Sequence, residues 1–487
     1  MGGGVSRSAI DRESYSRDAW VRALIGLAQG ERCESLPDAV AWPESDAEVA
    51  RVLRYASRRH IPVVPYGAGS GVCGAAVPTA GGIVLDMKRM DRLVSLRPDD
   101  HQATFQTGIL GQALEDRLAR RGFSLGHFPS SMYCSTLGGW LAARSAGQCS
   151  SRYGKIEDMA LGLRALTGSG EALETDVERT PDLGALLIGS EGTLAVITEA
   201  RLRIHPAPEL RLMRGYRFPG LAAGCDGMRR VMQLGLRPAV LRLYDPLDTL
   251  LASARGGGEA HLGRLGRVAA MLGPALRDRA RSLVVEHAAA VGRALSAALG
   301  PARGCLMIVG FEGTRERAAA EEALGRATLM EAGGKDLGPE PGDHWLANRY
   351  KVSYQQSKVF AAGAFVDTME VATTWDRLQS LYDAVRGAIA KKAFVMAHLS
   401  HAYPEGCSIY FTFVASVLDG QRRYDGIWSS ALSTALRVGG TLSHHHGIGQ
   451  LKAPWMAQEH GEAMKLLAAA KRALDPAGIL NPGKFLA

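Results

Sequence analysis

The first two hundred residues alternate between short apolar runs and stretches with helical spacing. Short apolar runs bounded by turn residues are typical of buried strands, and they cover 61–64, 83–87, 103–107, 161–172 (with a glycine-bearing turn at 168–170) and 194–204. Apolar residues three and four positions apart indicate amphipathic helices over 47–59 and 110–121. This alternation predicts an α+β domain.

The pattern changes near Pro206 and Pro208, where proline is typical of a boundary. From 210 to 415, strand-like and helix-like segments alternate with long Ala- and Arg-rich stretches. Because 487 residues exceed what one core fills, we expect two or three domains.

A helix-prone stretch in the second half, 267–299, is interrupted at Pro274. An amphipathic pattern of this kind is usually a helix packed on its own domain. The alternative is contact with a membrane surface through Arg277, Arg279 and Arg281.

Composition places the chain among ordinary enzymes. Hydrophobic residues make up 46% and charged residues 22% of the chain, as in soluble catalysts. No run of eighteen apolar residues and no apolar leader occurs, so we expect a cytoplasmic protein, with peripheral membrane contact as the variant of that expectation.

Charge and cysteine usage exclude several partners. The net charge of +8 is spread along the chain, which favours small anionic molecules or a phospholipid surface over nucleic acid. No base-reading motif occurs. The seven cysteines are scattered and never form a C-x-x-C pair, so reduced thiols are expected and a zinc knuckle is not.

Glycine concentrates in three separate segments. The first, 65–74, follows an apolar run and holds four glycines in ten residues; the others are 135–140 and 189–193. Glycine lets successive N–H groups turn toward an anion, and a diphosphate needs an approach that bulky side chains would block. Any one segment alone is typical of a tight turn. The three together predict a diphosphate and flavin site.

Three consecutive histidines, His444, His445 and His446, stand near the end of the chain. They cannot all face one way on a helix or strand, so a loop is predicted, and loops often carry functional residues. Imidazoles can donate or accept hydrogen bonds at neutral pH. A metal site and a solvated turn are the alternatives.

Four stretches taken together resemble a known flavoprotein group. They are 126–158, 189–200, 407–413 and 443–452. The group includes vanillyl-alcohol oxidase, glycolate oxidase subunits and alkyldihydroxyacetonephosphate synthase. The similarity runs from about Val40 onward, and the triple histidine with the tyrosine-bearing strand resembles the synthase branch.

The resemblance implies an α+β architecture. It comprises an FAD-binding domain of the PCMH type in two subdomains (40–206), an α+β cap or substrate domain (207–440) and a C-terminal segment that returns to the flavin (441–487). An N-terminal extension (1–39) precedes them. Some relatives attach FAD through a histidine in the first glycine loop; this loop has none, so non-covalent FAD is expected. A homodimer acting on a small molecule is also expected.

The resemblance also implies site residues. The FAD-binding residues would be Pro65, Gly67, Ala68, Gly69, Ser70, Gly71, Pro129, Ser135, Thr136, Gly138, Gly139, Ser145, Gly147, Glu191, Gly192 and Ile197. The catalytic residues would be Tyr410, His444, His445 and His446, and the substrate-binding residues Arg242 and Arg349.

The implied roles rest on ordinary side-chain chemistry. Tyr410 would act as acid or base; the alternative is a buried tyrosine with a satisfied hydroxyl. Arg242 would bind a phosphate; the alternative is a salt bridge with Asp245. A second family arginine is replaced by Gln356, for which Arg349 or Lys351 would compensate.

The leading hypothesis is therefore exchange of an acyl for an alkyl chain on dihydroxyacetone phosphate. The second is FAD-dependent oxidation of a D-2-hydroxy acid or another alcohol. Related hydroxy-acid dehydrogenases bind a metal through paired histidines and a glutamate. Here His401 is present, but Tyr410 and His445 stand where the other ligands would fall, so no metal is predicted. A flavin-binding scaffold without catalysis is the third hypothesis.

Overall fold

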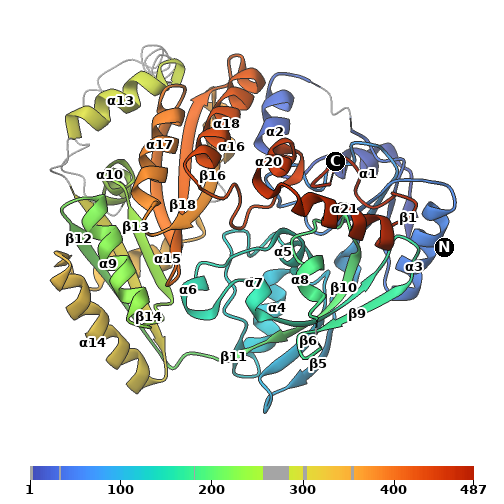
Figure 1. The fold of residues 1–487 in the computed structure, drawn as a ribbon, viewed down its shortest axis with the longest axis horizontal. Coiled ribbons are helices and arrows are strands. Elements are labelled where there is room, and N and C mark those ends of the chain that lie inside the picture. The colour runs from blue at the N-terminus through green and yellow to red at the C-terminus, as the bar shows by residue number, and fades with distance from the viewer. Residues whose placement is uncertain are drawn as a thin grey trace. The chain divides into compact units, whose positions relative to one another are not determined.

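The computed structural model describes residues 4–31, 35–179, 181–255, 285–299, 304–351 and 356–486. The chain forms two compact units (Figure 1). Unit 1 comprises Met1–Gly147, Tyr153–Ala207 and Ser443–Ala487, and unit 2 comprises Gln148–Arg152 and Pro208–Leu442. The C-terminal segment therefore belongs to the same unit as the N-terminus.

The first sheet of unit 1 has the order β1-β2-β4-β3. The strands are β1 (Val5–Ser6), β2 (Ala39–Ala41), β4 (Ile83–Asp86) and β3 (Val63–Tyr66). The last three are parallel, as expected for apolar runs buried on both faces, and β1 pairs antiparallel to β2. Helix α3 (Asp46–Ser57) buries Val49 and Leu53 in a core shared with Leu480.

The second sheet of unit 1 is antiparallel, in the order β5-β6-β10-β8-β9. Its strands are β5 (Leu93–Arg97), β6 (Gln102–Gln106), β10 (Val196–Arg203), β8 (Ala160–Leu166) and β9 (Ala172–Asp176). A two-stranded pair, β7 (Phe123–Ser124) with β11 (His205–Pro206), stands apart.

The helices of unit 1 are mostly short. They are α1 (Ala9–Ser14), α2 (Val21–Ala28), α4 (Gly111–Ala119), α5 (Leu137–Ala143), α7 (Ile156–Met159), α8 (Gly184–Leu187), α19 (Gly449–Lys452), α20 (Met456–His460) and α21 (Ala463–Leu474), with 3-10 turns at Met87–Arg89 and Ala453–Trp455. Helix α6 (Ser150–Tyr153) spans a boundary between the units.

Unit 2 is built on a seven-stranded antiparallel sheet, ordered β15-β12-β14-β13-β17-β18-β16. The strands are β15 (Lys335–Asp336), β12 (Leu210–Phe218), β14 (Cys305–Gly313), β13 (Val240–Tyr244), β17 (Phe394–Ala402), β18 (Gly406–Ser416) and β16 (Ala364–Thr374). The helices are α9 (Leu221–Gln233), α10 (Pro246–Arg255), α13 (Ala288–Leu299), α14 (Arg315–Glu331), α15 (Glu340–Asn348), α16 (Gln356–Ala361), α17 (Leu378–Ala390) and α18 (Gly420–Arg437).

One face of this sheet packs against α9 and α17. A Cβ at Gly224 of α9 would lie 2.6 Å from Leu243, and Phe411 of β18 stacks on Tyr382 of α17 at 6.1 Å between ring centroids. Helices α17 and α18 lie side by side, drawn in orange in Figure 1. Because side chains alternate along a strand, Arg242 and Tyr410 point to the opposite face.

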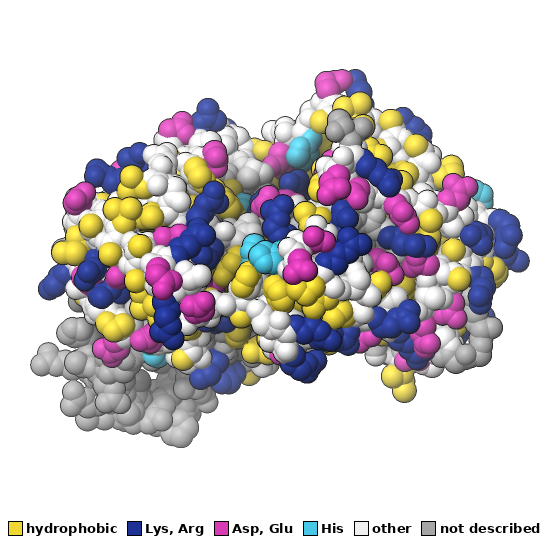
Figure 2. All heavy atoms as spheres, turned by 90° about the horizontal axis from the view of Figure 1, so that it is seen from below, with side chains coloured by type: hydrophobic (Ala, Val, Ile, Leu, Met, Phe, Trp, Pro, Cys, Tyr) yellow, Lys and Arg dark blue, Asp and Glu magenta, His cyan; other side chains and the backbone are white. Residues whose placement is uncertain are grey.

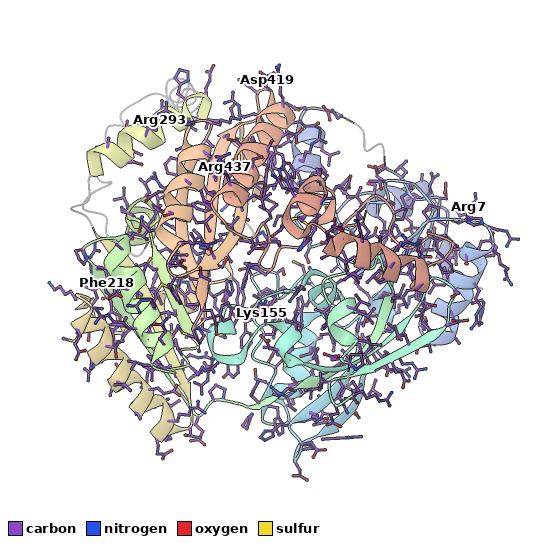
Figure 3. All side chains as sticks on the ribbon, viewed as in Figure 1. Arg7, Lys155, Phe218, Arg293, Asp419 and Arg437 are labelled. Carbon is purple, nitrogen blue, oxygen red and sulfur yellow. The ribbon has the colours of Figure 1, made fainter. Side chains whose placement is uncertain are left out.

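The predicted elements agree closely with the observed ones. The helices predicted over 47–59 and 110–121 are α3 and α4, and the turn at 168–170 joins β8 to β9. Within 267–299 the described helix is α13, whose Arg293 (labelled in Figure 3) donates from Nη1 to the Ala390 carbonyl of α17 at 2.8 Å. Arg277, Arg279 and Arg281 lie outside the described residues.

The charge distribution on one face and the polarity of the helices bear on the expectations from the sequence. On the face shown in Figure 2, Lys and Arg side chains are interspersed with Asp and Glu and do not gather in one patch. Among the described residues, the helices are too short or too polar to cross a membrane.

Candidate functional site

The first glycine segment follows β3 and leaves backbone donors unused. The amides of 68–71 donate no hydrogen bond to the described residues. Gly69 has φ +67°, a conformation that favours glycine, and a Cβ at Gly67 would collide with Oγ1 of Thr136. Unused amides in a turn where Gly67 and Gly69 admit no side chain are what a diphosphate requires, so this segment fits the cofactor predicted from the sequence.

The second glycine segment begins α5. Thr136 caps the helix by accepting the Gly139 N–H on Oγ1 at 3.2 Å, and the Gly138 N–H donates to the Thr107 carbonyl at 2.7 Å. A Cβ at Gly138 would lie 3.1 Å from Thr107. These amides are therefore occupied within the protein. The two glycines contribute close packing, and their amides are not free donors to a diphosphate.

The third glycine segment is joined to the C-terminal segment by a buried carboxylate. Glu191 takes a left-handed conformation, with φ +52°. Its carboxylate accepts the N–H groups of Ile448 at 2.7 Å and Gly449 at 2.8 Å. Burial raises the Glu191 pKa to about 7, against the lowering effect of these two amides and Lys452. This contact fixes the chain on the C-terminal side of the three histidines.

Asn481 links two glycine segments. Its Nδ2 donates to the carbonyls of Ala75 at 2.9 Å and Glu191 at 2.7 Å. The first and third segments, far apart in sequence, are therefore brought together through one amide side chain near the end of the chain.

The histidine loop has the irregular conformation predicted from its sequence. His444 and His445 approach with their Nδ1 atoms 3.0 Å apart, and the rings of His445 and His446 lie 4.6 Å apart, nearly perpendicular. Ser443 Oγ donates to the Gly447 carbonyl at 3.1 Å and closes the loop. The histidines lie in unit 1 with the glycine segments.

The other residues predicted to bind FAD also lie in unit 1. Ser145 Oγ lies 3.2 Å from Nε2 of buried His127, and the Ile197 carbonyl accepts from Thr107 Oγ1 at 2.6 Å. A Cβ at Gly147 would approach the Phe128 amide at 2.5 Å. Pro65 packs against Gly192. Ser135 Oγ accepts a hydrogen bond from Trp140 Nε1 at 2.7 Å. The Pro129 carbonyl accepts the Met132 N–H at 3.1 Å.

In unit 2, a row of polar side chains crosses the sheet face opposite α9 and α17. Tyr244, His398, Tyr410 and Glu370 are direct cross-strand partners on β13, β17, β18 and β16. The rings of His398 and Tyr410 stack at 4.8 Å, and the Tyr410 hydroxyl donates to Thr368 Oγ1 at 3.0 Å. Register alone places these groups side by side.

Arg242 of β13 joins this row through His398. Arg242 Nη2 lies 2.7 Å from His398 Nε2, and since guanidinium can only donate, Nε2 accepts. The proton of the neutral ring then sits on Nδ1, 3.4 Å from Asp248 Oδ2. Burial, with the Arg242 charge, lowers the His398 pKa well below its usual value, which keeps the ring neutral.

Arg242 does not form the alternative salt bridge with Asp245. The Asp245 carboxylate instead accepts from the Tyr382 hydroxyl at 3.1 Å and the Ala397 N–H at 3.0 Å, and lies 3.5 Å from Arg386 Nε. Asp245 follows β13 and is directed toward α17. The Arg242 Nε is buried without a hydrogen-bond partner among the described residues.

Tyr410 is expected to stay un-ionised across the physiological range. Burial raises its pKa from 10.0 to about 12, although the hydrogen bond with Thr368 and the Arg242 charge lower it. Because Tyr410 ionises at lower pH in the unfolded chain than in the folded protein, its contribution to the stability of the fold is lost as pH rises from 10 to 12. The test is a pH titration of the near-ultraviolet tyrosinate absorbance of the wild type and of Tyr410→Phe. The absorbance difference between the two proteins should develop only near pH 12. A difference signal near pH 8 would contradict it.

The remaining predicted residues are placed as follows. Arg349 ends α15 with its guanidinium 4.8 Å from the Tyr350 ring centre, and Gln356 begins α16. His401 has its Nδ1 2.7 Å from Ser150 Oγ. Among the described residues, no group of three or more His, Cys, Asp and Glu side chains could hold a metal ion.

Sequence reasoning missed His398 and Asp248. The alternating run 394–402 carries His398, and its strand pattern was a usable signal. Its pairing with Tyr410 depends on a β-bulge between Ser400 and Ala402, which the sequence does not reveal.

The fold and these features define an FAD-dependent enzyme. Residues 37–176 match the family described as "FAD binding domain", and residues 207–485 match "FAD linked oxidases, C-terminal domain". The chain belongs to the FAD-linked oxidase family. The expected α+β fold, with an N-terminal FAD-binding domain followed by an oxidase domain, is confirmed.

The chain is also similar to individual proteins of known name. The chain is 31% identical over 468 residues to alkyldihydroxyacetonephosphate synthase of Trypanosoma brucei brucei, covering 92% of this chain and 73% of the relative. It is 26% identical to glycolate oxidase subunit GlcD of Bacillus subtilis (strain 168), covering 93% and 90%. A solved alkyldihydroxyacetonephosphate synthase structure superposes with a TM-score of 0.79 at 26% identity, covering 99% of this chain and 83% of that one.

Proposed function

We propose that this enzyme exchanges an acyl for an alkyl chain on dihydroxyacetone phosphate. The observation that carries the proposal is the row in unit 2, where the neutral phenol of Tyr410 stacks on His398 and His398 holds the Arg242 guanidinium. A phenol in place of a metal-binding histidine suits proton movement, and the guanidinium suits a phosphate. Similarity to the Trypanosoma brucei brucei synthase supports the same reaction.

The glycine segments of unit 1 are the proposed cofactor site. The free amides of 68–71 would hold the diphosphate of FAD, and the second and third segments would lie along it. The first segment, 65–74, contains no histidine, so non-covalent binding is proposed. When bound, FAD supplies the ring at which the substrate carbon is activated.

The protein residues have separate roles in this proposal. Arg242 binds the phosphate, and His398 orients Arg242 by accepting one of its N–H groups. Tyr410, un-ionised at neutral pH, donates a proton or hydrogen bond to an oxygen that gains charge. In the net exchange the C1–O bond to the acyl group breaks, and the carboxylate leaves with the electron pair. The alcohol oxygen bonds to C1 and loses its proton, so no electrons are gained or lost.

Oxidation of a D-2-hydroxy acid is the second candidate. It is favoured by similarity to GlcD of Bacillus subtilis over most of both chains. This reaction would transfer two electrons to the cofactor and bleach its absorbance.

Anaerobic mixing separates the two candidates. Purified protein with FAD is mixed with acyl-dihydroxyacetone phosphate and hexadecanol, and separately with D-lactate. We expect the ether product by mass spectrometry with an unchanged flavin spectrum, and no bleaching by D-lactate. Bleaching by D-lactate without ether formation would favour the second candidate. If neither the ether product nor bleaching is observed, both candidates are contradicted.

A further inference from the structure

Residues 15–20 lie outside both matched family ranges but contact the first glycine segment. The Tyr66 hydroxyl, at the entry to this segment, donates to the Arg17 carbonyl at 3.1 Å. The Trp20 ring fills the space beside Gly74, where a Cβ would lie 2.6 Å from it. The described part of the N-terminal extension expected over 1–39 packs within unit 1.

Asp18 is the buried acid of this contact, with 5% of its surface exposed. Its Oδ1 accepts the Trp20 N–H at 3.1 Å, and its Oδ2 accepts the Ala76 N–H at 3.3 Å. A buried carboxylate is unfavourable unless it is paired and hydrogen-bonded. Here the two amides and the charge of Lys484, itself 1% exposed, offset part of that cost, and burial still raises the Asp18 pKa to about 6.

A second contact fixes the start of the same segment. The Tyr15 hydroxyl donates to Asp86 Oδ2 at 2.5 Å, and Lys88 Nζ donates to the same oxygen at 2.6 Å. Lys88 Nζ also donates to the Gly67 carbonyl at 2.9 Å. Tyr15 therefore acts, through Asp86 and Lys88, near the start of the first glycine segment. Asp18 acts just after its end, through the Ala76 amide.

We propose that residues 15–20 contribute to FAD binding by positioning the first glycine segment. Asp18 is a positioning residue: by holding the amides of Trp20 and Ala76, it fixes the turn so that the amides of 68–71 converge on the FAD diphosphate before it binds. Preorganised donors bind more tightly because they need no ordering on association. This inference rests on the proposed cofactor site.

Titration of the full-length apoprotein with FAD, followed by flavin fluorescence, tests the proposal. Asp18→Asn should raise the dissociation constant for FAD about tenfold, because one oxygen becomes an NH2 that faces an amide N–H and the attraction to Lys484 is lost. Tyr66→Phe, which removes only the hydroxyl that donates to Arg17, should raise it severalfold. Asp11→Asn, on exposed α1, is the matched control and should change nothing.

A third variant distinguishes this inference from the cofactor site on which it rests. Ser70→Glu places a negative charge among the proposed diphosphate donors and should abolish FAD binding. If Ser70→Glu binds FAD normally, the proposed site is wrong. If it abolishes binding while Asp18→Asn and Tyr66→Phe stay within twofold of wild type, the site stands and the role of residues 15–20 is overturned. Should Asp18→Asn fail to fold, Tyr66→Phe decides the matter.

Discussion

Replacing Tyr410 with Phe is expected to remove turnover while FAD stays bound. The substitution keeps the ring that stacks on His398 and deletes only the hydroxyl that donates to Thr368. Loss of a positioned acid typically lowers rate by about 100- to 10,000-fold. The measurements are kcat with the acyl substrate and alcohol, and FAD content from the visible absorbance of the purified protein.

Tyr424→Phe is the matched control for this result. The Tyr424 hydroxyl donates to Asp367 Oδ2 at 2.7 Å on the opposite face of the same sheet. Its loss should lower the melting temperature, since a hydrogen bond contributes about 0.5–1.5 kcal/mol, and should leave kcat intact. Unchanged turnover in Tyr410→Phe would exclude the proposed role of the phenol.

Replacing Arg242 with Met is expected to weaken binding of a phosphorylated substrate strongly. A charge-assisted hydrogen bond contributes about 1.5–3 kcal/mol, so KM should rise about 10- to 100-fold, with a smaller change in kcat. Steady-state kinetics with the phosphorylated substrate measure this split.

An exposed arginine provides the comparison for Arg242. Arg230 pairs with Asp226 on α9 at 2.6 Å, and 48% of its side chain is exposed. Such pairs contribute about 0–1 kcal/mol, so Arg230→Met should leave both constants unchanged. Equal effects of the two substitutions would argue against a substrate role for Arg242.

Features encoded by local sequence were predictable. The periodicity of 47–59 and 110–121 is sufficient to indicate helices, and alternation in 407–413 indicates a strand. The glycine content of 65–74 indicates a turn with accessible amides, because that property belongs to the residues themselves.

Features that depend on long-range pairing were not predictable. A shift of one residue in the register of β17 against β18 would turn His398 to the face that packs against α9 and α17, and nothing local specifies that register. The Gly138 amide is occupied by the carbonyl of Thr107, which lies thirty-one residues earlier in the chain. The Gly139 amide is occupied by the nearby Thr136 side chain. The two-residue strand β1 is too short to leave a periodic signal.

The discontinuous make-up of unit 1 bears on the order of events during biosynthesis. Asn481 bonds Ala75 and Glu191, and Leu480 forms an isolated bridge with Val63 beside β3. The ribosome makes the Pro208–Leu442 part of unit 2 between these partners, so the nascent chain cannot complete unit 1 until translation has passed Asn481. FAD can therefore bind to the complete unit 1 only after nearly the whole chain has been synthesised.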